Sequence, residues 1–161
     1  MMSSMVLVTT WSLIIGVGMM AGVYFAFSTF IMPAFDDLPS KQAIAAMNSI
    51  NRVIVKSLFL PLFFGTTLLA LVQLVLSQVY LHGVASYLGG AAGLTYLLTM
   101  FLCTAVFNVP LNNRLNRFDQ REDNADSAWC SYRLPWTRWN HVRTVGSLVS
   151  VVLSLSVLAS L

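Results

Sequence analysis

The chain has 161 residues, a length that suits one domain, and 57% of them are hydrophobic while only 9% are charged. Soluble proteins carry about a quarter charged residues, and a soluble fold of this composition would expose aggregating apolar patches. The composition therefore excludes a soluble protein and predicts a single integral membrane domain, residues 1–161, in contact with the lipid bilayer. The nine Lys and Arg residues fall in two blocks rather than along one stripe, which excludes a nucleic-acid-binding surface.

The first span is predicted at residues 5–32, within an N-terminal stretch of 35 residues that carries no charge. The absence of Lys and Arg at its start does not fit a signal peptide, so we interpret it as a retained span. Pro33 is expected to end this helix. Tyr24 and Ser28 share a face near that end. Tyr24 is interpreted either as an interfacial anchor or as part of a polar pocket.

The segment that follows the first span predicts an amphipathic helix lying at the membrane interface. Its apolar residues recur at helical spacing from Ile44 to Ile54, after a possible N-cap at Ser40. Asn48, Asn51 and Arg52 fall on one polar face of that helix. This face is interpreted either as a solvated surface or as part of a functional site.

Residues 57–113 carry no charge and are long enough for two spans joined by a tight turn near His82. We place these spans at residues 57–81 and 85–109. Pro110 should end or bend the third span, and it is surrounded by Asn108, Asn112 and Asn113. The three amides either satisfy carbonyl groups that the proline leaves unpaired or line a site.

A charged, polar segment follows the third span, and a short helix is expected within it from residue 126 or 127 towards Leu134. Pro135 should then end that helix or open the last span, which we place at residues 136–161. The predicted fold is all-α, a four-transmembrane-helix bundle with an additional amphipathic interfacial helix between the first and second spans.

The charge distribution predicts the orientation of the four spans. All Lys and Arg residues lie in the loops 33–56 and 110–143, and four spans place these two loops on one side of the membrane. The positive-inside rule assigns that side to the cytoplasm and leaves both termini outside. We expect this membrane to be a bacterial inner membrane.

The stretch Leu134–Thr144, LPWTRWNHVRT, directly precedes a fully uncharged run. Four spans bring its polar groups to the membrane rim where other polar residues gather, and such a cluster is a site hypothesis because unpaired polar groups are costly there. The residues expected at this site are Tyr24, Asn48, Asn51, Arg52, Asn108, Asn112, Asn113, Trp139, Asn140, His141 and Arg143.

The sequence lacks the residues that several kinds of metal or cofactor site require. His82 and His141 are expected on opposite membrane faces, which disfavours a bis-His haem, and the chain has no Glu-x-x-His pair for a di-iron centre. The two cysteines, Cys103 and Cys130, form no metal-binding pair. We therefore predict no metal site and no cofactor. His141 remains as a possible base that removes a proton from a carbon acid, or as an interfacial anchor.

Two motifs carry a resemblance to a known family: N-x-P-x-N at Asn108–Asn112 and W-x-x-x-N-x-x-R at Trp136–Arg143. Together with the blocks Gly22–Phe35 and Ala45–Arg52, they resemble the membrane domain shared by fungal anthrone oxygenases and small bacterial membrane proteins. The resemblance implies four membrane helices and, for the fungal members, oxidation of an anthrone to an anthraquinone by O₂. It implies His141 as the base, with Asn108, Asn112, Asn140 and Arg143 orienting the substrate.

Two functions therefore stand side by side at this stage. The first is a small, cofactor-independent membrane oxygenase that acts on a phenolic or polycyclic ketone. The second is a non-enzymatic membrane protein that binds a quinone-like or lipid ligand, or a protein partner, at the same rim. The sequence does not determine the oligomeric state.

Overall fold

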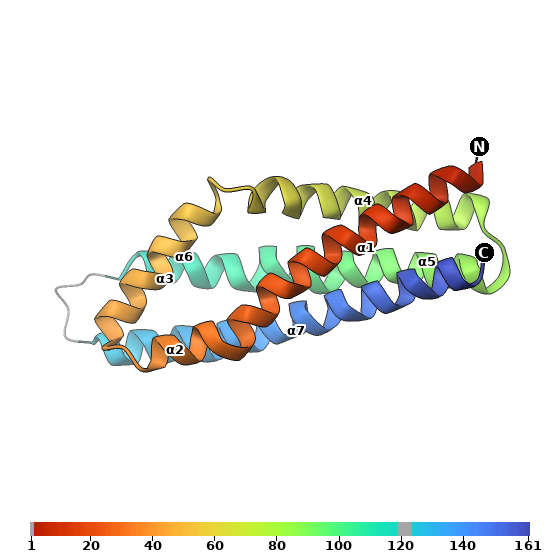
Figure 1. The fold of residues 1–161 in the computed structure, drawn as a ribbon. Coiled ribbons are helices and arrows are strands. Elements are labelled where there is room, and N and C mark those ends of the chain that lie inside the picture. The colour runs from red at the N-terminus through yellow and green to blue at the C-terminus, as the bar shows by residue number, and fades with distance from the viewer. Residues whose placement is uncertain (1, 119–123) are drawn as a thin grey trace.

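The computed structural model describes residues 2–118 and 124–161, and every regular element in these ranges is a helix (Figure 1). Four helical runs are long and apolar enough to cross a membrane, which confirms the four predicted spans. The elements are α1 (Met2–Ala26), η1 (Phe27–Ile31), α2 (Met32–Asp36), α3 (Ser40–Ile54), α4 (Phe59–Tyr80), α5 (Gly83–Tyr96), η2 (Leu97–Leu102), η3 (Thr104–Asn108), α6 (Val109–Asn116) and α7 (Ala125–Ala159).

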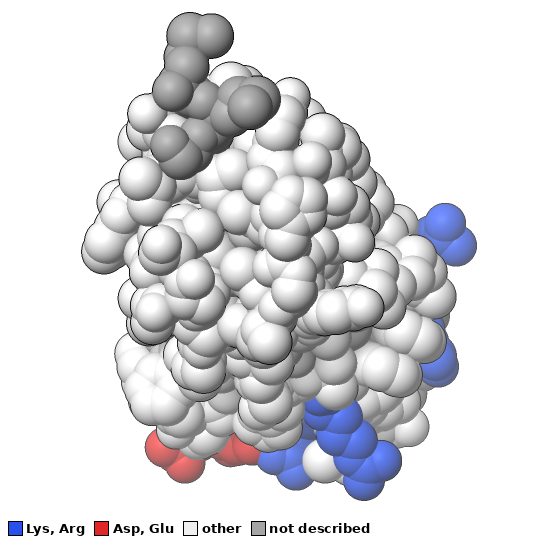
Figure 2. Space-filling view, turned by 90° about the vertical axis from the view of Figure 1, so that its right-hand side faces the viewer, with Lys and Arg blue, Asp and Glu red and all other residues white. Residues whose placement is uncertain are grey.

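The four spans form one bundle in which α1 and α5 each pack against both α4 and α7. Both termini and the α4–α5 turn lie at one end, and Gly83 has the positive φ of 59° that this turn requires (Figure 1). At the other end lie α3, α6 and the first half of α7, which we call the basic end. Figure 2 looks onto the opposite end, where the surface toward the viewer is white and charged side chains appear only along the lower and right-hand edges.

All described Lys and Arg residues lie in α3, in α6, directly after one of these two helices, or in α7 between Arg133 and Arg143. The two basic segments therefore share one end, as four spans require. The side of the membrane that this end faces stays a prediction.

The first span continues through Pro33, which was expected to end it, and the third span continues through Pro110, which was expected to end or bend it. The first span runs past Pro33 to Asp36, and the third runs past Pro110 to Asn116. In both, a π-helical segment directly precedes the proline, and the amides of Met32 and Val109 donate to carbonyls five residues back. The wider turn accommodates a residue that lacks an N–H and would clash with a carbonyl of a regular α-helix.

The last span is also longer than expected. Neither a short separate helix nor a break at Pro135 is present, because α7 is one helix of 35 residues with Pro135 inside it. At 1.5 Å per residue it extends about 52 Å, well beyond a hydrocarbon core of about 30 Å. Its first turns pack Trp129, Tyr132 and Trp136 against α3 and α6 at the basic end. This tertiary packing outweighs the local cost of the proline.

The helix predicted between the first two spans is present as α3, and its apolar side is buried. Ala43, Ile44 and Met47 pack into the aromatic cluster formed with α7. Its position at the membrane interface stays a prediction. Ser40 is the first helical residue and makes no capping bond, since Pro39 occupies the cap position.

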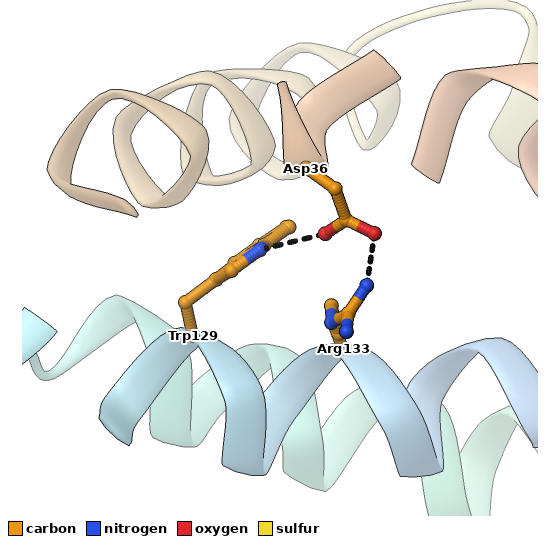
Figure 3. A network of polar contacts seen from close by, with 3 residues as sticks. All are labelled: Asp36, Trp129 and Arg133. Carbon is orange, nitrogen blue, oxygen red and sulfur yellow. Dashed lines mark hydrogen bonds and ion pairs between the residues drawn. The ribbon is translucent and has the colours of Figure 1, made fainter. Parts of the chain in front are cut away.

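A polar contact fastens the extended end of the first span to α7 (Figure 3). One carboxylate oxygen of Asp36 accepts a hydrogen bond of 3.1 Å from the Trp129 indole, and the other pairs with Arg133. This is the one ion pair among residues 2–118 and 124–161. It closes the basic end next to the site described below.

Because α4 and α5 pack closely, we predict that replacing Gly93 by a larger residue destabilises the fold. A Cβ there would lie 2.5 Å from the Ala70 carbonyl oxygen, whereas a Cβ at Gly65 would meet nothing within 4 Å. We expect Gly93→Ala to destabilise the fold by about 1–3 kcal/mol through overpacking. The measurement is thermal unfolding in detergent, with Gly65→Ala as the control. Equal melting temperatures for the two variants would contradict the packing described here.

Candidate functional site

A cavity of about 440 Å³ lies at the basic end, enclosed by the first span, α3, the start of α4, the third span and α7. This volume falls within the range of small-molecule sites, which is about 300–1,000 Å³. Most of its wall is apolar and rich in aromatic rings, among them Phe27, Phe59, Phe63, Phe64, Phe101 and Trp136. The polar groups in the wall are Tyr24, Asn51, Thr104, Asn108, Asn112, Asn113, Asn140 and Arg143.

Arg143 is the charged group of this wall, and its side chain is only 5% exposed. Its Nη2 donates to the Asn140 Oδ1 at 2.7 Å, its Nη1 donates to the Thr104 Oγ1 at 3.4 Å, and its Nε has no hydrogen-bond partner in the described residues. The guanidinium carbon lies 4.4 Å from the centre of the Tyr24 ring and 5.2 Å from that of Trp136. Only neutral groups therefore surround this cation.

A buried cation without a carboxylate is costly, since removing a charge from water costs several kcal/mol even after relaxation. Cation–π contacts return about 2 kcal/mol each when they are desolvated. The ring hydroxyl of Tyr24 is buried close to Thr104 and the Arg143 guanidinium, and it makes no hydrogen bond of good geometry with the described residues. Arg143 and Tyr24 thus have hydrogen-bond donors available at the cavity wall. An anionic oxygen bound in the cavity would accept hydrogen bonds from both.

Asn140 links α7 to the first span and orients Arg143. Its Nδ2 donates to the Tyr24 carbonyl oxygen and to the Ser28 Oγ, both at 2.7 Å. Its Oδ1 is thereby turned toward Arg143. Asn140 is fully buried. Its amide therefore holds the cation in one place on the cavity wall.

The asparagines around Pro110 connect the third span to α7. The Asn108 Nδ2 donates to the Trp136 carbonyl oxygen at 3.3 Å. The Asn112 Oδ1 accepts from the Tyr132 hydroxyl at 2.9 Å and from the Trp136 indole at 2.8 Å. These bonds fix the orientation of both amides where they line the cavity.

The structure brings seven of the eleven expected site residues to the cavity: Tyr24, Asn51, Asn108, Asn112, Asn113, Asn140 and Arg143. Asn48 instead donates to the Leu115 carbonyl oxygen at 3.3 Å, and Arg52 is exposed. Trp139 lies outside the cavity and stacks on Phe107, with ring centres 3.6 Å apart.

The imidazole of His141 also lies outside the cavity, contrary to the expectation that it and the asparagines would converge on one hollow. Successive helical residues point about 100° apart, and here Asn140 faces the cavity while the imidazole of His141 points away from it. His141 is exposed, and its Nδ1 lies 2.9 Å from the Ser28 Oγ. It therefore reaches the cavity wall only through Ser28, which also contacts Asn140.

The sequence reasoning did not include Trp136, Thr104 or the phenylalanine wall in the site. Trp136, Asn140 and Arg143 follow an i, i+4, i+7 spacing, which places them on one helix face and could have identified Trp136. Phe63 and Phe101 belong to different spans, with ring centres 5.9 Å apart. No spacing within the sequence predicts that contact.

Fold and site together define an integral membrane protein with an apolar, aromatic-rich cavity at its basic end. The family model for anthrone oxygenase matches residues 51–153, and the chain belongs to the anthrone oxygenase family. The matched region contains both asparagines beside Pro110 and the segment from Trp136 to Arg143, whereas Tyr24 lies before it. No curated protein and no solved structure matches the chain.

The bonds of Asn140 predict its effect on stability. Asn140→Ala removes the acceptor of the Arg143 Nη2 and the donor to the Tyr24 carbonyl oxygen, leaving both buried. We expect a loss of about 1–3 kcal/mol, which is the usual cost of unsatisfied buried groups. Thermal unfolding measures it, and Val142→Ala, at an exposed position of the same helix, is the control. The assigned role fails if both variants unfold at the wild-type temperature.

Proposed function

We propose that this chain is a membrane oxygenase that binds a phenolic or polycyclic ketone in the cavity and oxidises it with O₂ without a bound cofactor. The observation that carries the proposal is the buried Arg143, paired with no carboxylate in the described residues, beside the buried hydroxyl of Tyr24. Membership of the anthrone oxygenase family supports the same reaction class. The aromatic wall suits a flat, polycyclic ligand.

The proposed reaction begins at an acidic methylene next to an aromatic ketone. Loss of a proton moves negative charge onto the ketone oxygen, and the donors of Arg143 and Tyr24 stabilise that oxyanion. The carbanion passes one electron to O₂, and the resulting radicals combine into a peroxide of the substrate. The peroxide loses water to give the second carbonyl. Overall, a CH₂ group and O₂ become a C=O group and H₂O.

The protein stabilises the anion in this proposal rather than supplying a strong base. The cavity wall holds no carboxylate and no imidazole among the described residues. The substrate proton therefore passes to water that enters the cavity, and Arg143 favours this transfer by stabilising the product anion. His141 acts as a positioning residue: it holds Ser28, which holds Asn140, which holds Arg143.

A second candidate function follows from the same observation. A cavity with an oxyanion site and no proton acceptor in its described wall also suits a protein that binds a quinone-like ligand without converting it. A non-enzymatic protein of this kind would bind a lipid or a protein partner equally well in place of the quinone-like ligand. Catalytic turnover distinguishes the oxygenase from this alternative.

The oxygenase predicts a strong dependence on Arg143. Purified protein is incubated with emodin anthrone in air, and formation of the anthraquinone is followed by absorbance. We expect Arg143→Gln to lower kcat/KM about 10²–10³-fold, the usual effect of removing an oxyanion donor. Arg138→Gln, at an exposed position outside the cavity, should retain wild-type activity. Wild-type conversion no faster than the spontaneous reaction would exclude the oxygenase for this substrate class.

The position of His141 predicts a modest effect of its removal. His141→Gln should lower kcat/KM less than about tenfold and leave the shape of its pH profile unchanged, because a general base contributes about 10²–10⁴-fold. His82→Gln, at the opposite end of the bundle, is the matched control. A loss above 10²-fold together with a changed pH profile would instead make His141 the base.

A further inference from the structure

Part of the cavity wall is exposed on the outside of the bundle. Phe64 on α4 and Val109 on the third span both line the cavity, yet they are 55% and 43% exposed. Ala105, one turn before Val109, also lines the cavity and is exposed. A residue that is both lining and exposed stands at the mouth of a cavity. Together with Leu60, these residues form what we call the lateral opening.

The opening follows from how α4 and the third span pack. Toward the α4–α5 turn they are in close contact, because Gly93 of α5 lies directly against the backbone of α4. Toward the basic end, the rings of Phe63 and Phe101 stand between them. Figure 1 shows α3 leading from the end of α2 past α6 to the start of α4. The cavity lies where the two spans have separated.

The lateral opening lies at the edge of the hydrocarbon layer. At 1.5 Å per residue, Ala105 is about 33 Å along the helix from Gly83, compared with a hydrocarbon thickness of about 30 Å. Phe64 belongs to a membrane-spanning helix. The four side chains at the opening are all apolar. A molecule dissolved among the acyl chains, with its polar group at the headgroups, would meet this opening directly.

We propose that the cavity takes its ligand sideways from the bilayer through the lateral opening, and that the ligand is a lipid-soluble planar aromatic with one acidic oxygen. This inference rests on the function proposed for the cavity and adds the solubility class and entry route of the substrate. The apolar opening admits the neutral molecule without desolvating a charge. Ionisation then follows inside, next to Arg143.

The test measures binding of emodin to the protein in phosphatidylcholine vesicles by stopped-flow absorbance. Ala105→Phe narrows the opening and should slow association at least tenfold. Val106→Phe places the same ring on the adjacent residue, which is 50% exposed and outside the cavity, and should leave the rate within twofold of wild type. Phe64→Ala widens the opening and should accelerate association, whereas Leu68→Ala, one turn further along α4, should not.

Two further measurements distinguish an effect on the entry route from an effect on the binding site. Raising the lipid concentration at fixed emodin should slow association in wild type, because only the concentration within the membrane matters. Arg143→Gln should weaken binding through faster dissociation and leave association unchanged. Equal association rates in Ala105→Phe and Val106→Phe, or rates independent of lipid, would overturn the lateral route while the cavity proposal stands. Absence of any binding to wild type would overturn both.

Discussion

The buried guanidinium of Arg143 is the constraint on which the rest of the site depends. It lies in an apolar cavity and is held by an amide, a hydroxyl and two aromatic rings. Such neutral partners return only part of the cost of removing a cation from water. The remaining cost explains why Asn140 is buried and bonded in three directions, and it is the reason for proposing a ligand with a negatively charged oxygen.

The two π-helical segments explain how helices containing Pro33 and Pro110 reach the site. Each widens the helix directly before its proline, so the first and third spans continue toward the basic end rather than stopping at the cavity. Asn112 and Asp36 lie on these continuations and bind side chains of α7. The length of α7 matters in a similar way, because its first turns pack Trp129 and Tyr132 into the buried cluster that also contains the cavity-lining Trp136.

The sequence was sufficient for the fold and for part of the site, and the reasons are physical. Charge-free runs predicted four spans because each must cross a hydrocarbon layer of fixed thickness. Asn140 and Arg143 were both expected at the site, and their i, i+3 spacing places them on one helix face. The continuation of helices through Pro33 and Pro135 was missed, because it depends on packing at the basic end. The outward position of His141 was missed because the sequence alone does not tell which face of α7 points into the bundle. Only the contacts between spans determine that face.

The central claim is that Arg143 makes the cavity selective for an aromatic oxyanion. A spectrophotometric pH titration of emodin bound to the protein tests it most directly, because ionisation of a phenol changes its visible absorption. The account predicts that the bound ligand ionises at lower pH than emodin in protein-free vesicles of the same lipid. It predicts that this difference disappears in Arg143→Gln. Ionisation of bound emodin at the same or higher pH than in lipid alone would contradict the account.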